Sequence, residues 1–219
     1  MLQLINFYKN KKILVTGHTG FKGSWLAYVL YNFGAKVYGY SLKPSKKISN
    51  FQTLNLERRI DNYFSDIRDK KRLNNYIKKI KPDLIFHLAA QSLVKHSYKD
   101  PSYTIQTNVN GTLNILNSIF KNKEVGGVLI ITSDKCYKNK EKISGYKEND
   151  ELGGIDPYSA SKASAEIITH AFLKSYFNKN KRLGVATARA GNVIGGGDWS
   201  NDRIIPDFIK SIKNKKNFY

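Results

Sequence analysis

The chain has 219 residues, of which 41% are hydrophobic, which suits a globular protein with one substantial core and one or two domains. Its 37 lysines and arginines exceed its 17 acidic residues, so the formal net charge is +20, a balance that favours anionic ligands such as phosphorylated substrates. The lysines are scattered, with no zinc pattern, recognition helix or aromatic RNA-binding strand, so no nucleic-acid partner is expected.

The sequence also argues against a membrane or secreted protein. No apolar run approaches the length of a membrane span, and the apolar start is too short and too soon charged for a signal peptide. We therefore expect a cytoplasmic protein without a membrane partner. Cys136 is the only cysteine, which excludes an internal disulfide; we expect it to pack in the core, and we expect no metal site.

Short β-rich runs alternate with amphipathic segments along the chain. The runs expected to form strands are 13–16, 36–40, 63–66, 84–88, 128–132 and 183–189. The segments expected to form helices are 21–33, 70–79, 103–120, 157–177 and 204–212. This alternation predicts an α/β fold with a doubly wound parallel sheet of the Rossmann type. Long loops are expected at 41–60 and 191–203, where ligand sites commonly lie in such folds.

A glycine-rich turn follows the first expected strand directly. The glycines at positions 17, 20 and 23 have the spacing Gly-x-x-Gly-x-x-Gly, and a helix-like segment begins at Phe21. A strand, a glycine turn and a helix in this order place backbone amides and a positive helix end against a diphosphate. The sequence therefore predicts a dinucleotide site here, although glycines at a strand end can also serve only as turn residues.

The next two strand ends leave the choice of dinucleotide open. The second strand ends at Ser41 without the acidic residue that binds a ribose 2′-hydroxyl, and Ser41 with Lys43 could accommodate NADP. After the third strand, the Asp66 carboxylate could bind adenine, with Ile67 against the ring. Alternatively, Asp66 caps a helix that begins near Arg68.

Two groups of residues suggest acid and base chemistry. Ser133, Asp134 and Lys135 supply a hydroxyl, an acid and a base in succession at the end of the fifth strand. Tyr158 and Lys162 are four residues apart, so they share one face of a helix and the ammonium can lower the pKa of the phenol. Such a tyrosine can act as a base near neutral pH. Taken alone, a Tyr and a Lys at this spacing are also common on helix surfaces.

Together these motifs resemble the extended short-chain dehydrogenase/reductases and, within them, the CDP-glucose 4,6-dehydratases. Five blocks carry the resemblance. They are GHTGFKGSW at 17–25, HLAAQ at 87–91, TSDKCY at 132–137, DPYSASK at 156–162 and ARAGNVIGGGDW at 188–199. The Ser-Asp-Lys run is the most discriminating of them, since dTDP-glucose dehydratases have an Asp-Glu pair instead.

The resemblance implies NAD as the cofactor and residues that bind it. These are Gly17, Gly20, Phe21, Gly23, Asp66, Ile67, Leu88, Ala89, Ala90, Tyr158 and Lys162. The small residues after the fourth strand would admit the nicotinamide ribose. Asn108 is expected to help position the active-site lysine, unless it points into solvent. His18 and Lys22 could touch cofactor phosphates or be solvated.

The resemblance also implies a reaction, the dehydration of CDP-D-glucose to CDP-4-keto-6-deoxy-D-glucose. Tyr158, aided by Lys162 and Ser133, would remove the 4-hydroxyl proton during transient oxidation at C4 by NAD. Lys135, if buried, would take the C5 proton while Asp134 protonates the departing 6-hydroxyl, and hydride would then return to C6. Another NAD(P)-dependent nucleotide-sugar dehydratase, epimerase or reductase is an alternative, and a non-enzymatic dinucleotide-binding module is a more distant one.

The same resemblance sets the expected domain organisation. Residues 1–190 would form the NAD-binding domain, and 191–219 would begin a substrate-binding portion that is mostly missing. Gln91, Asn192 and Arg203 are the expected contacts to the nucleotide sugar, and the full-length protein is expected to be a homodimer.

Overall fold

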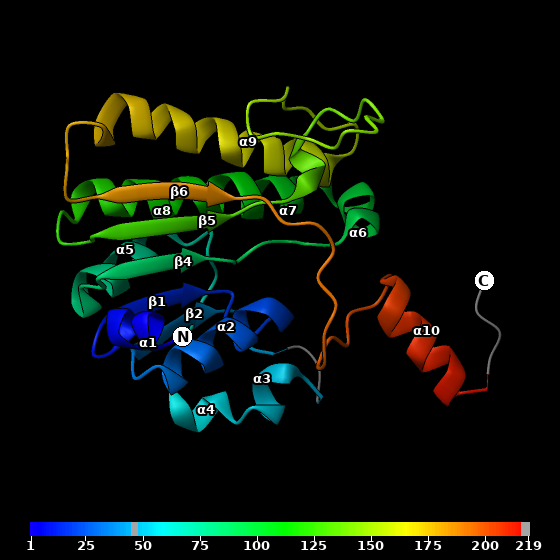
Figure 1. Ribbon diagram of the computed structural model, residues 1–219, viewed down its shortest axis with the longest axis horizontal. Helices are drawn as coiled ribbons and strands as arrows, with labels where there is room; N and C mark the ends of the chain where they lie inside the picture. Colours follow the sequence, from blue (N-terminus) through cyan, green and yellow to red (C-terminus); the bar gives the residue numbers. More distant parts are fainter. Residues whose placement is uncertain (45–47, 216–219) are drawn as a thin grey trace.

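A six-stranded parallel sheet forms the centre of the computed structural model, which describes residues 1–44 and 48–215 (Figure 1). The strands are β1 (Lys12–Thr16), β2 (Lys36–Ser41), β3 (Asp61–Phe64), β4 (Leu84–His87), β5 (Gly127–Ile131) and β6 (Gly184–Ala188). They lie in the order β3-β2-β1-β4-β5-β6, and every neighbouring pair is parallel. The strand order reverses between β1 and β4, and at such a point the loops diverge and leave a crevice at the carboxyl ends of the strands. The predicted Rossmann-type fold is confirmed.

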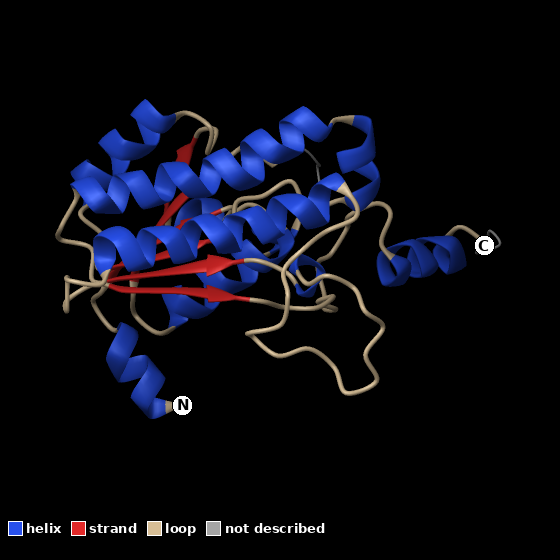
Figure 2. Ribbon diagram, turned by 90° about the horizontal axis from the view of Figure 1, so that it is seen from above, coloured by secondary structure: helices blue, strands red, loops and turns tan. Residues whose placement is uncertain are grey.

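Helices flank the sheet on both faces (Figure 2). The α-helices are α1 (Leu2–Tyr8), α2 (Phe21–Asn32), α3 (Asn50–Thr53), α4 (Leu56–Arg59), α5 (Lys70–Ile80), α6 (Val94–Lys99), α7 (Pro101–Ile105), α8 (Gly111–Lys121), α9 (Pro157–Phe172) and α10 (Ile204–Lys213). Three short turns complete the set: the π-helical turns η1 (Gln106–Asn110) and η3 (Leu173–Phe177), and the 3-10 turn η2 (Asp134–Cys136).

Alternating strand residues divide the core into two clusters, because successive side chains of a strand point to opposite faces of a sheet. On one face, Leu14 and Ile85 pack with residues of α5 and α8. On the other, Ile13 and Val15 pack with residues of α2, α3 and α4. All four of these strand residues are fully or almost fully buried. The two covered faces fix the sheet and hence the positions of the loops at its carboxyl edge.

The helices differ from the prediction mainly between strands. The expected loop 41–60 contains α3 and α4, since Phe51 and Leu56 are buried against the sheet and Ser49 caps α3. The expected helix 103–120 begins earlier, at Pro101, and is interrupted by η1. The short helices α1 and α6 were not predicted. By contrast, 191–203 contains no helix or strand, as expected.

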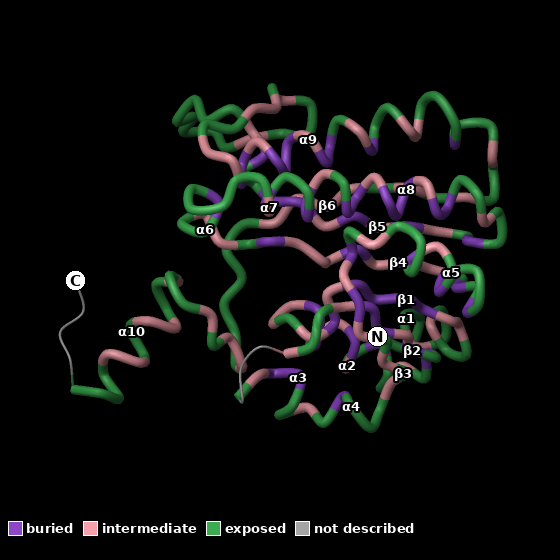
Figure 3. Tube along the Cα trace, turned by 180° about the vertical axis from the view of Figure 1, so that it is seen from behind, coloured by how far each residue is buried: buried purple, intermediate pink, exposed green. Residues whose placement is uncertain are grey.

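The last helix, α10, lies away from the rest of the chain (Figures 1 and 3). None of its residues is buried, although it is amphipathic. Ile204 and Ile212 are 71% and 61% exposed. The preceding loop nevertheless returns to the body of the protein, because Trp25 in α2 donates a hydrogen bond from Nε1 to the carbonyl of Gly196 at 2.9 Å.

Candidate active site

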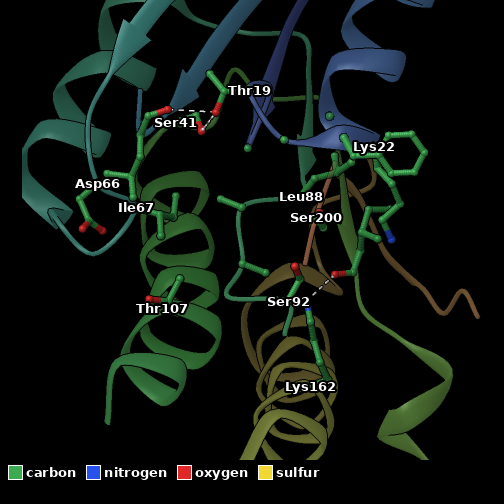
Figure 4. Close-up of a pocket in the computed structure, with 18 of the residues that line it drawn as sticks. Thr19, Lys22, Ser41, Asp66, Ile67, Leu88, Ser92, Thr107, Lys162 and Ser200 are labelled. Carbon is green, nitrogen blue, oxygen red and sulfur yellow. Dashed lines mark hydrogen bonds between the residues drawn. The ribbon is translucent and has the colours of Figure 1, made fainter. Parts of the chain in front are cut away.

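A cavity of about 300 Å³ opens at the carboxyl ends of β1 and β4, where the strand order reverses. Its wall includes the glycine turn, the ends of β2 to β5, the start of α9 and the loop after β6. The polar and charged side chains in this wall are Thr19, Lys22, Ser41, Ser65, Asp66, Ser92, Tyr103, Thr107, Thr132, Tyr158, Lys162, Ser200 and Arg203. Figure 4 shows several of them converging on the same space. Every residue predicted to bind the cofactor lies in this wall.

The glycine turn has no room for a side chain at Gly17 or at Gly23. Gly17 has φ +73°, a left-handed conformation that favours glycine, and a Cβ there would lie 2.8 Å from the backbone nitrogen of Ala89. A Cβ on Gly23 would lie 2.1 Å from the carbonyl oxygen of Gly17. The first turn of α2 is thereby held against the end of β1. This arrangement presents the helix N-terminus to the cavity and fits a dinucleotide diphosphate.

His18 lies in the core, so both alternatives stated for it, a contact with cofactor phosphates and a solvated side chain, are wrong. Its ring is fully buried beside Phe51 and Phe64, and its Nε2 is 2.9 Å from Oδ1 of Asn62. Burial lowers the pKa of His18 to about 4, against a smaller opposing effect of the Asn62 hydrogen bond. A neutral imidazole therefore fills the space above Gly39.

Where the loop after β3 lines the cavity, the Asp66 carboxylate is bound by the neighbouring Arg68. Its carboxylate accepts hydrogen bonds from the backbone N–H and the guanidinium of Arg68, the shortest at 2.6 Å. These bonds lower the pKa of Asp66, and burial opposes them only in part. The alternative in which Asp66 caps the helix is wrong, because α5 begins at Lys70 and its cap is Asp69, which accepts from the Arg72 N–H. Asp66 instead binds Arg68 in the turn before the helix, and it lines the cavity.

The end of β2 has no acidic residue, and hydroxyl groups lie there instead. Thr19 Oγ1 and Ser41 Oγ lie 2.8 Å apart in a hydrogen bond, and Thr19 also donates to the carbonyl of Leu42 (Figure 4). No carboxylate from the β2 end lines this part of the cavity among the described residues. The choice between NAD and NADP is therefore not made by a carboxylate here.

A buried histidine fixes the loop after β4. The backbone N–H groups of Leu88 and Ala89 both donate to Thr16 Oγ1 at 3.2 Å. Thr16 Oγ1 is 2.8 Å from Nδ1 of His87, and His87 Nε2 is 3.3 Å from Thr112 Oγ1. Burial and the charge of Lys162 lower the pKa of His87 to about 3. The neutral ring thus keeps the 88–90 backbone exposed to the cavity.

Asn108 is 2% exposed and contacts the residue before the active-site lysine, so the alternative in which it points into solvent is wrong, and its help in positioning Lys162 stays a prediction. Its side chain accepts a hydrogen bond from the backbone N–H of Gln91 at 2.8 Å and donates to the hydroxyl of Ser161 at 2.8 Å. It sits in η1, where the wider π turn carries it toward the loop after β4; such turns are frequent at functional sites. Asn108 therefore joins that loop to α9, one residue before Lys162.

Two of the three predicted substrate contacts do not line the cavity. Gln91 is buried, and its amide is used internally, donating to Thr104 Oγ1 at 2.8 Å and accepting from the N–H of Leu93. Asn192 is exposed outside the cavity wall. Arg203 does line the cavity, and its guanidinium lies 3.5 Å from Ser92 Oγ and 3.8 Å from the Asp198 carboxylate.

Tyr158 and Lys162 come from successive turns of α9, which begins with Pro157 after the cap Asp156. Burial raises the pKa of Tyr158, partly opposed by its hydrogen bond with Ser133 and the charge of Arg203. The prediction that the ammonium lowers the pKa of Tyr158 is therefore wrong, because burial raises this pKa by more than the opposing effects lower it. Burial also lowers the pKa of Lys162 to about 8. The two pKa values, 10.0 and 10.5 for the free groups, are thus moved apart, and that of Lys162 lies below that of Tyr158.

Ser133, Asp134 and Lys135 form the transition from β5 to η2. Ser133 is buried, donates to the Asp134 carboxylate at 2.9 Å and accepts from the Lys135 backbone N–H at 3.2 Å. The burial expected for Lys135 is absent, because Asp134 and Lys135 are both exposed. Asp134 nevertheless acts on Lys22 in the cavity wall, since its charge opposes the lowering of the Lys22 pKa by burial and by Arg203.

Several cavity residues were not predicted from the sequence. Thr19, Ser65, Ser92, Tyr103, Thr107 and Ser200 all line the wall. Thr19, Ser65 and Ser92 follow a strand end within a few residues, so taking every polar residue in those loops as a candidate would have found them. Ser200 lies further along the loop after β6. Tyr103 and Thr107 lie on helices and carried no such signal.

Two negative findings concern the described part of the chain. None of its helices has both the length and the apolar character needed to cross a bilayer. It also contains no group of histidine, cysteine and acidic side chains suited to hold a metal ion.

The fold, the glycine turn and the Tyr158–Lys162 pair define the class of Rossmann-type short-chain dehydrogenase/reductases. The sequence model of the GDP-mannose 4,6 dehydratase family matches residues 14–216. The chain therefore belongs to this family of nucleotide-sugar dehydratases, in agreement with the resemblance seen in its motifs.

Individual relatives agree. CDP-glucose 4,6-dehydratase of Salmonella typhimurium is 46% identical over 215 residues, covering 96% of this chain and 60% of the relative. The crystal structure of dTDP-glucose 4,6-dehydratase from Streptomyces venezuelae, with NAD bound, superposes with a TM-score of 0.79 at 26% identity, covering 93% of this chain and 62% of that one. UDP-glucose 4-epimerase of Thermotoga maritima with UDP-glucose gives a TM-score of 0.83 at 26% identity, covering 94% and 64%. The chain thus spans about three fifths of the length of these relatives.

Proposed function

We propose that the chain carries the catalytic part of a CDP-glucose 4,6-dehydratase, which converts CDP-D-glucose to CDP-4-keto-6-deoxy-D-glucose. The observation that carries this proposal is that Tyr158 and Lys162 line the same cavity as the glycine turn. A dinucleotide held by the turn would end next to a phenol and an ammonium. Such a pair suits reversible proton transfer at a sugar hydroxyl.

NAD is the proposed cofactor. The turn that brings Gly17 and Gly23 together would hold the diphosphate, and the backbone of residues 88–90 would border the nicotinamide. Bound there, NAD would supply the hydride acceptor for oxidation at C4 and the hydride donor for reduction at C6. The NAD in the related Streptomyces dehydratase structure supports this assignment.

Tyr158 has the position of the proton acceptor for the sugar 4-hydroxyl. Its phenol is hydrogen-bonded to Ser133, and Lys162 lies one turn further along α9. The hydrogen bond with Ser133 and the positive charge of Arg203 both favour the phenolate. Ser133 would donate to the sugar oxygen if its hydroxyl, which donates to Asp134 in this structure, turned toward a bound sugar.

Asp134 and Lys135 are assigned to the elimination of water. The 4-ketone makes the C5 proton acidic, Lys135 takes it as a base, and Asp134 gives a proton to the leaving 6-hydroxyl. Both side chains are exposed and lie outside the cavity wall, and the Asp134 carboxylate accepts a hydrogen bond from Ser133, so the proposed elimination requires both to turn toward a bound sugar. A base and an acid on neighbouring residues allow the C5 proton and the 6-hydroxyl to leave together.

The choice of CDP-D-glucose rests on the 46% identity to the Salmonella enzyme and on the Ser-Asp-Lys run. Arg203 is the proposed contact for the substrate diphosphate, since its guanidinium borders the cavity. We further propose that residues 1–190 form the NAD-binding domain, that 191–219 begin a substrate-binding part, and that the full-length protein is a cytoplasmic homodimer.

The experiment that tests the function is mass spectrometry of CDP-glucose after incubation with the protein and NAD. dTDP-glucose and GDP-mannose serve as control substrates. Loss of one water from CDP-glucose alone is the expected result. An isomer of unchanged mass would indicate an epimerase instead, and no change in any nucleotide sugar would contradict the proposed activity of this chain.

A further inference from the structure

A buried carboxylate on the catalytic helix is not used by the proposed chemistry. Glu166 lies one turn beyond Lys162 in α9 and is only 5% exposed. It does not line the cavity. A buried charge is costly unless it is paired and hydrogen-bonded, so its partners should indicate what it does.

Glu166 joins the ends of two strands to the helix. One carboxylate oxygen, Oε1, accepts a hydrogen bond from the hydroxyl of Thr132, directly after β5. The other, Oε2, accepts from Thr187 Oγ1 in β6 at 2.8 Å and from Arg189 Nη2 at 3.0 Å. Burial raises the pKa of Glu166, but the bonds from Arg189, Thr132 and Thr187 together outweigh it. The carboxylate is thus charged and fully engaged.

Three consecutive residues at the end of β5 connect Glu166 to the active-site residues of α9. Lys162 donates to the carbonyl of Ile131 at 3.1 Å, Glu166 binds the Thr132 hydroxyl, and Tyr158 is hydrogen-bonded to Ser133. Three turns of α9 therefore hold three successive residues. A shift of Thr132 along the helix would move Ser133 away from the phenol.

Arg189 extends the same arrangement to the segment that follows η2. Its guanidinium stacks over the ring of Tyr137 at 4.7 Å from the ring centroid. Its Nη1 donates to the carbonyl of Glu148 at 2.9 Å, while Nη2 binds Glu166. Arg189 therefore links Tyr137, which follows Asp134 and Lys135, to α9 through the carboxylate of Glu166.

We propose that Glu166 is a positioning residue, which holds Ser133 against Tyr158 and anchors the Asp134–Lys135 segment through Thr132 and Arg189. This inference rests on the proposed function for its effect on catalysis, whereas its structural part stands on the contacts alone. The role needs the charge as well as the shape, because only a carboxylate pairs with Arg189 while accepting from two hydroxyls.

The test compares Glu166→Gln with Glu124→Gln, which removes a carboxylate from the exposed Lys81–Glu124 ion pair. Ile77→Val in the core of α5 serves as a variant of reduced stability with an intact site. Three quantities are measured: dehydration of CDP-glucose, affinity for NAD by calorimetry, and hydrogen exchange of backbone amides. The amide of Asp134 is informative, since it donates to the carbonyl of Ala190 at 3.1 Å.

For Glu166→Gln we expect kcat to fall about 10- to 100-fold, as for misplaced catalytic groups. KM and NAD affinity should stay within about twofold, because Glu166 touches neither site. Hydrogen exchange of the backbone amides at residues 132–137 should be faster in Glu166→Gln than in Ile77→Val. Glu166→Asp, which keeps the charge, should recover part of the rate. Unchanged kcat in Glu166→Gln would overturn the proposal.

The two proposals fail separately. If the unaltered chain does not dehydrate CDP-glucose, the proposed function fails, and hydrogen exchange alone decides the role of Glu166. Faster exchange at 132–137 in Glu166→Gln, without a matching change in Ile77→Val, would support the positioning role. Equal exchange in the two variants would exclude it.

Discussion

The Nζ atom of Lys162 lies 3.1 Å from the carbonyl oxygen of Ile131 and donates a hydrogen bond to it. This bond fixes the ammonium at the end of β5, one turn of α9 from Tyr158. The lysine is buried at 7% exposure, and its pKa falls to about 8. Its charge is thus held inside the cavity wall, where it acts on a phenolate and on any bound cofactor more strongly than in water.

Tyr158→Phe should stop the reaction before sugar oxidation, because the phenol is the proposed acceptor of the hydroxyl proton. We expect the rate to fall about 100- to 10,000-fold, the usual contribution of a general base. Absorbance of the reduced cofactor and the mass of the nucleotide sugar measure the two stages. Tyr98→Phe, at a tyrosine that is 65% exposed, is the control. Reduced cofactor at the parental rate would exclude the role of Tyr158.

Lys135→Ala should separate oxidation from elimination. The variant keeps Tyr158 and Lys162, so the 4-ketone and reduced cofactor should still form, while water loss falls about 100-fold or more for want of the C5 base. Rapid-quench mass spectrometry distinguishes the two. Lys138→Ala removes another exposed lysine three residues away, whose partner is Glu151, and should dehydrate normally. Water loss at the parental rate in Lys135→Ala would remove this residue from the mechanism.

Gly23→Ala should abolish cofactor binding without changing any polar group. The added Cβ would lie 2.1 Å from the carbonyl oxygen of Gly17, so the turn and the start of α2 must separate. Overpacking of this kind typically costs about 1–3 kcal/mol of stability. Gly196→Ala is the matched control, because nothing lies within 4 Å of its Cβ position. Calorimetric titration with NAD and denaturant unfolding measure both effects; equal affinity in the two variants would contradict the assigned diphosphate site.

Acid should destabilise the chain through two buried histidines. The pKa values of His18 and His87 are about 4 and about 3 when folded, against 6.5 in an unfolded chain. Between these limits the unfolded state binds more protons, so stability is complete above about pH 6.5 and declines as the pH falls. Each histidine should contribute about 1.4 kcal/mol per pH unit within its window.

Urea unfolding between pH 7 and pH 4.5 measures this dependence. His87→Gln should reduce the slope by about one proton, because the variant has one fewer group that protonates on unfolding. His170→Gln, at an exposed histidine on α9, is the control for replacing a histidine by glutamine. A slope that His87→Gln does not change would show that His87 is not neutral in the folded chain.

Sequence periodicity predicted the sheet and most of its helices, because buried strands and amphipathic helices depend on local pattern. It missed α3, in which Phe51 is the only apolar residue, because a helix of four residues is too short to show a helical period. It also missed the break at η1, where a π turn depends on what Asn108 contacts rather than on local propensity.

The site residues divide in the same way. Gly17 and Tyr158 were found because a turn or a helix face requires them at that spacing. Gln91 was assigned to substrate from its block, but its amide is satisfied by Thr104 from a distant helix. Likewise, the pKa of Tyr158 depends on burial by the whole fold, which neighbouring residues in sequence do not specify.

The bond between Trp25 and Gly196 joins residues 171 positions apart. It closes the cavity with a segment that is synthesised long after the glycine turn. The wall that contains Ser200 and Arg203 follows β6, the strand that pairs with β5. Such distant contacts form late, since long loops must close first. The nascent chain therefore lacks this wall until residues 196–203 have been synthesised.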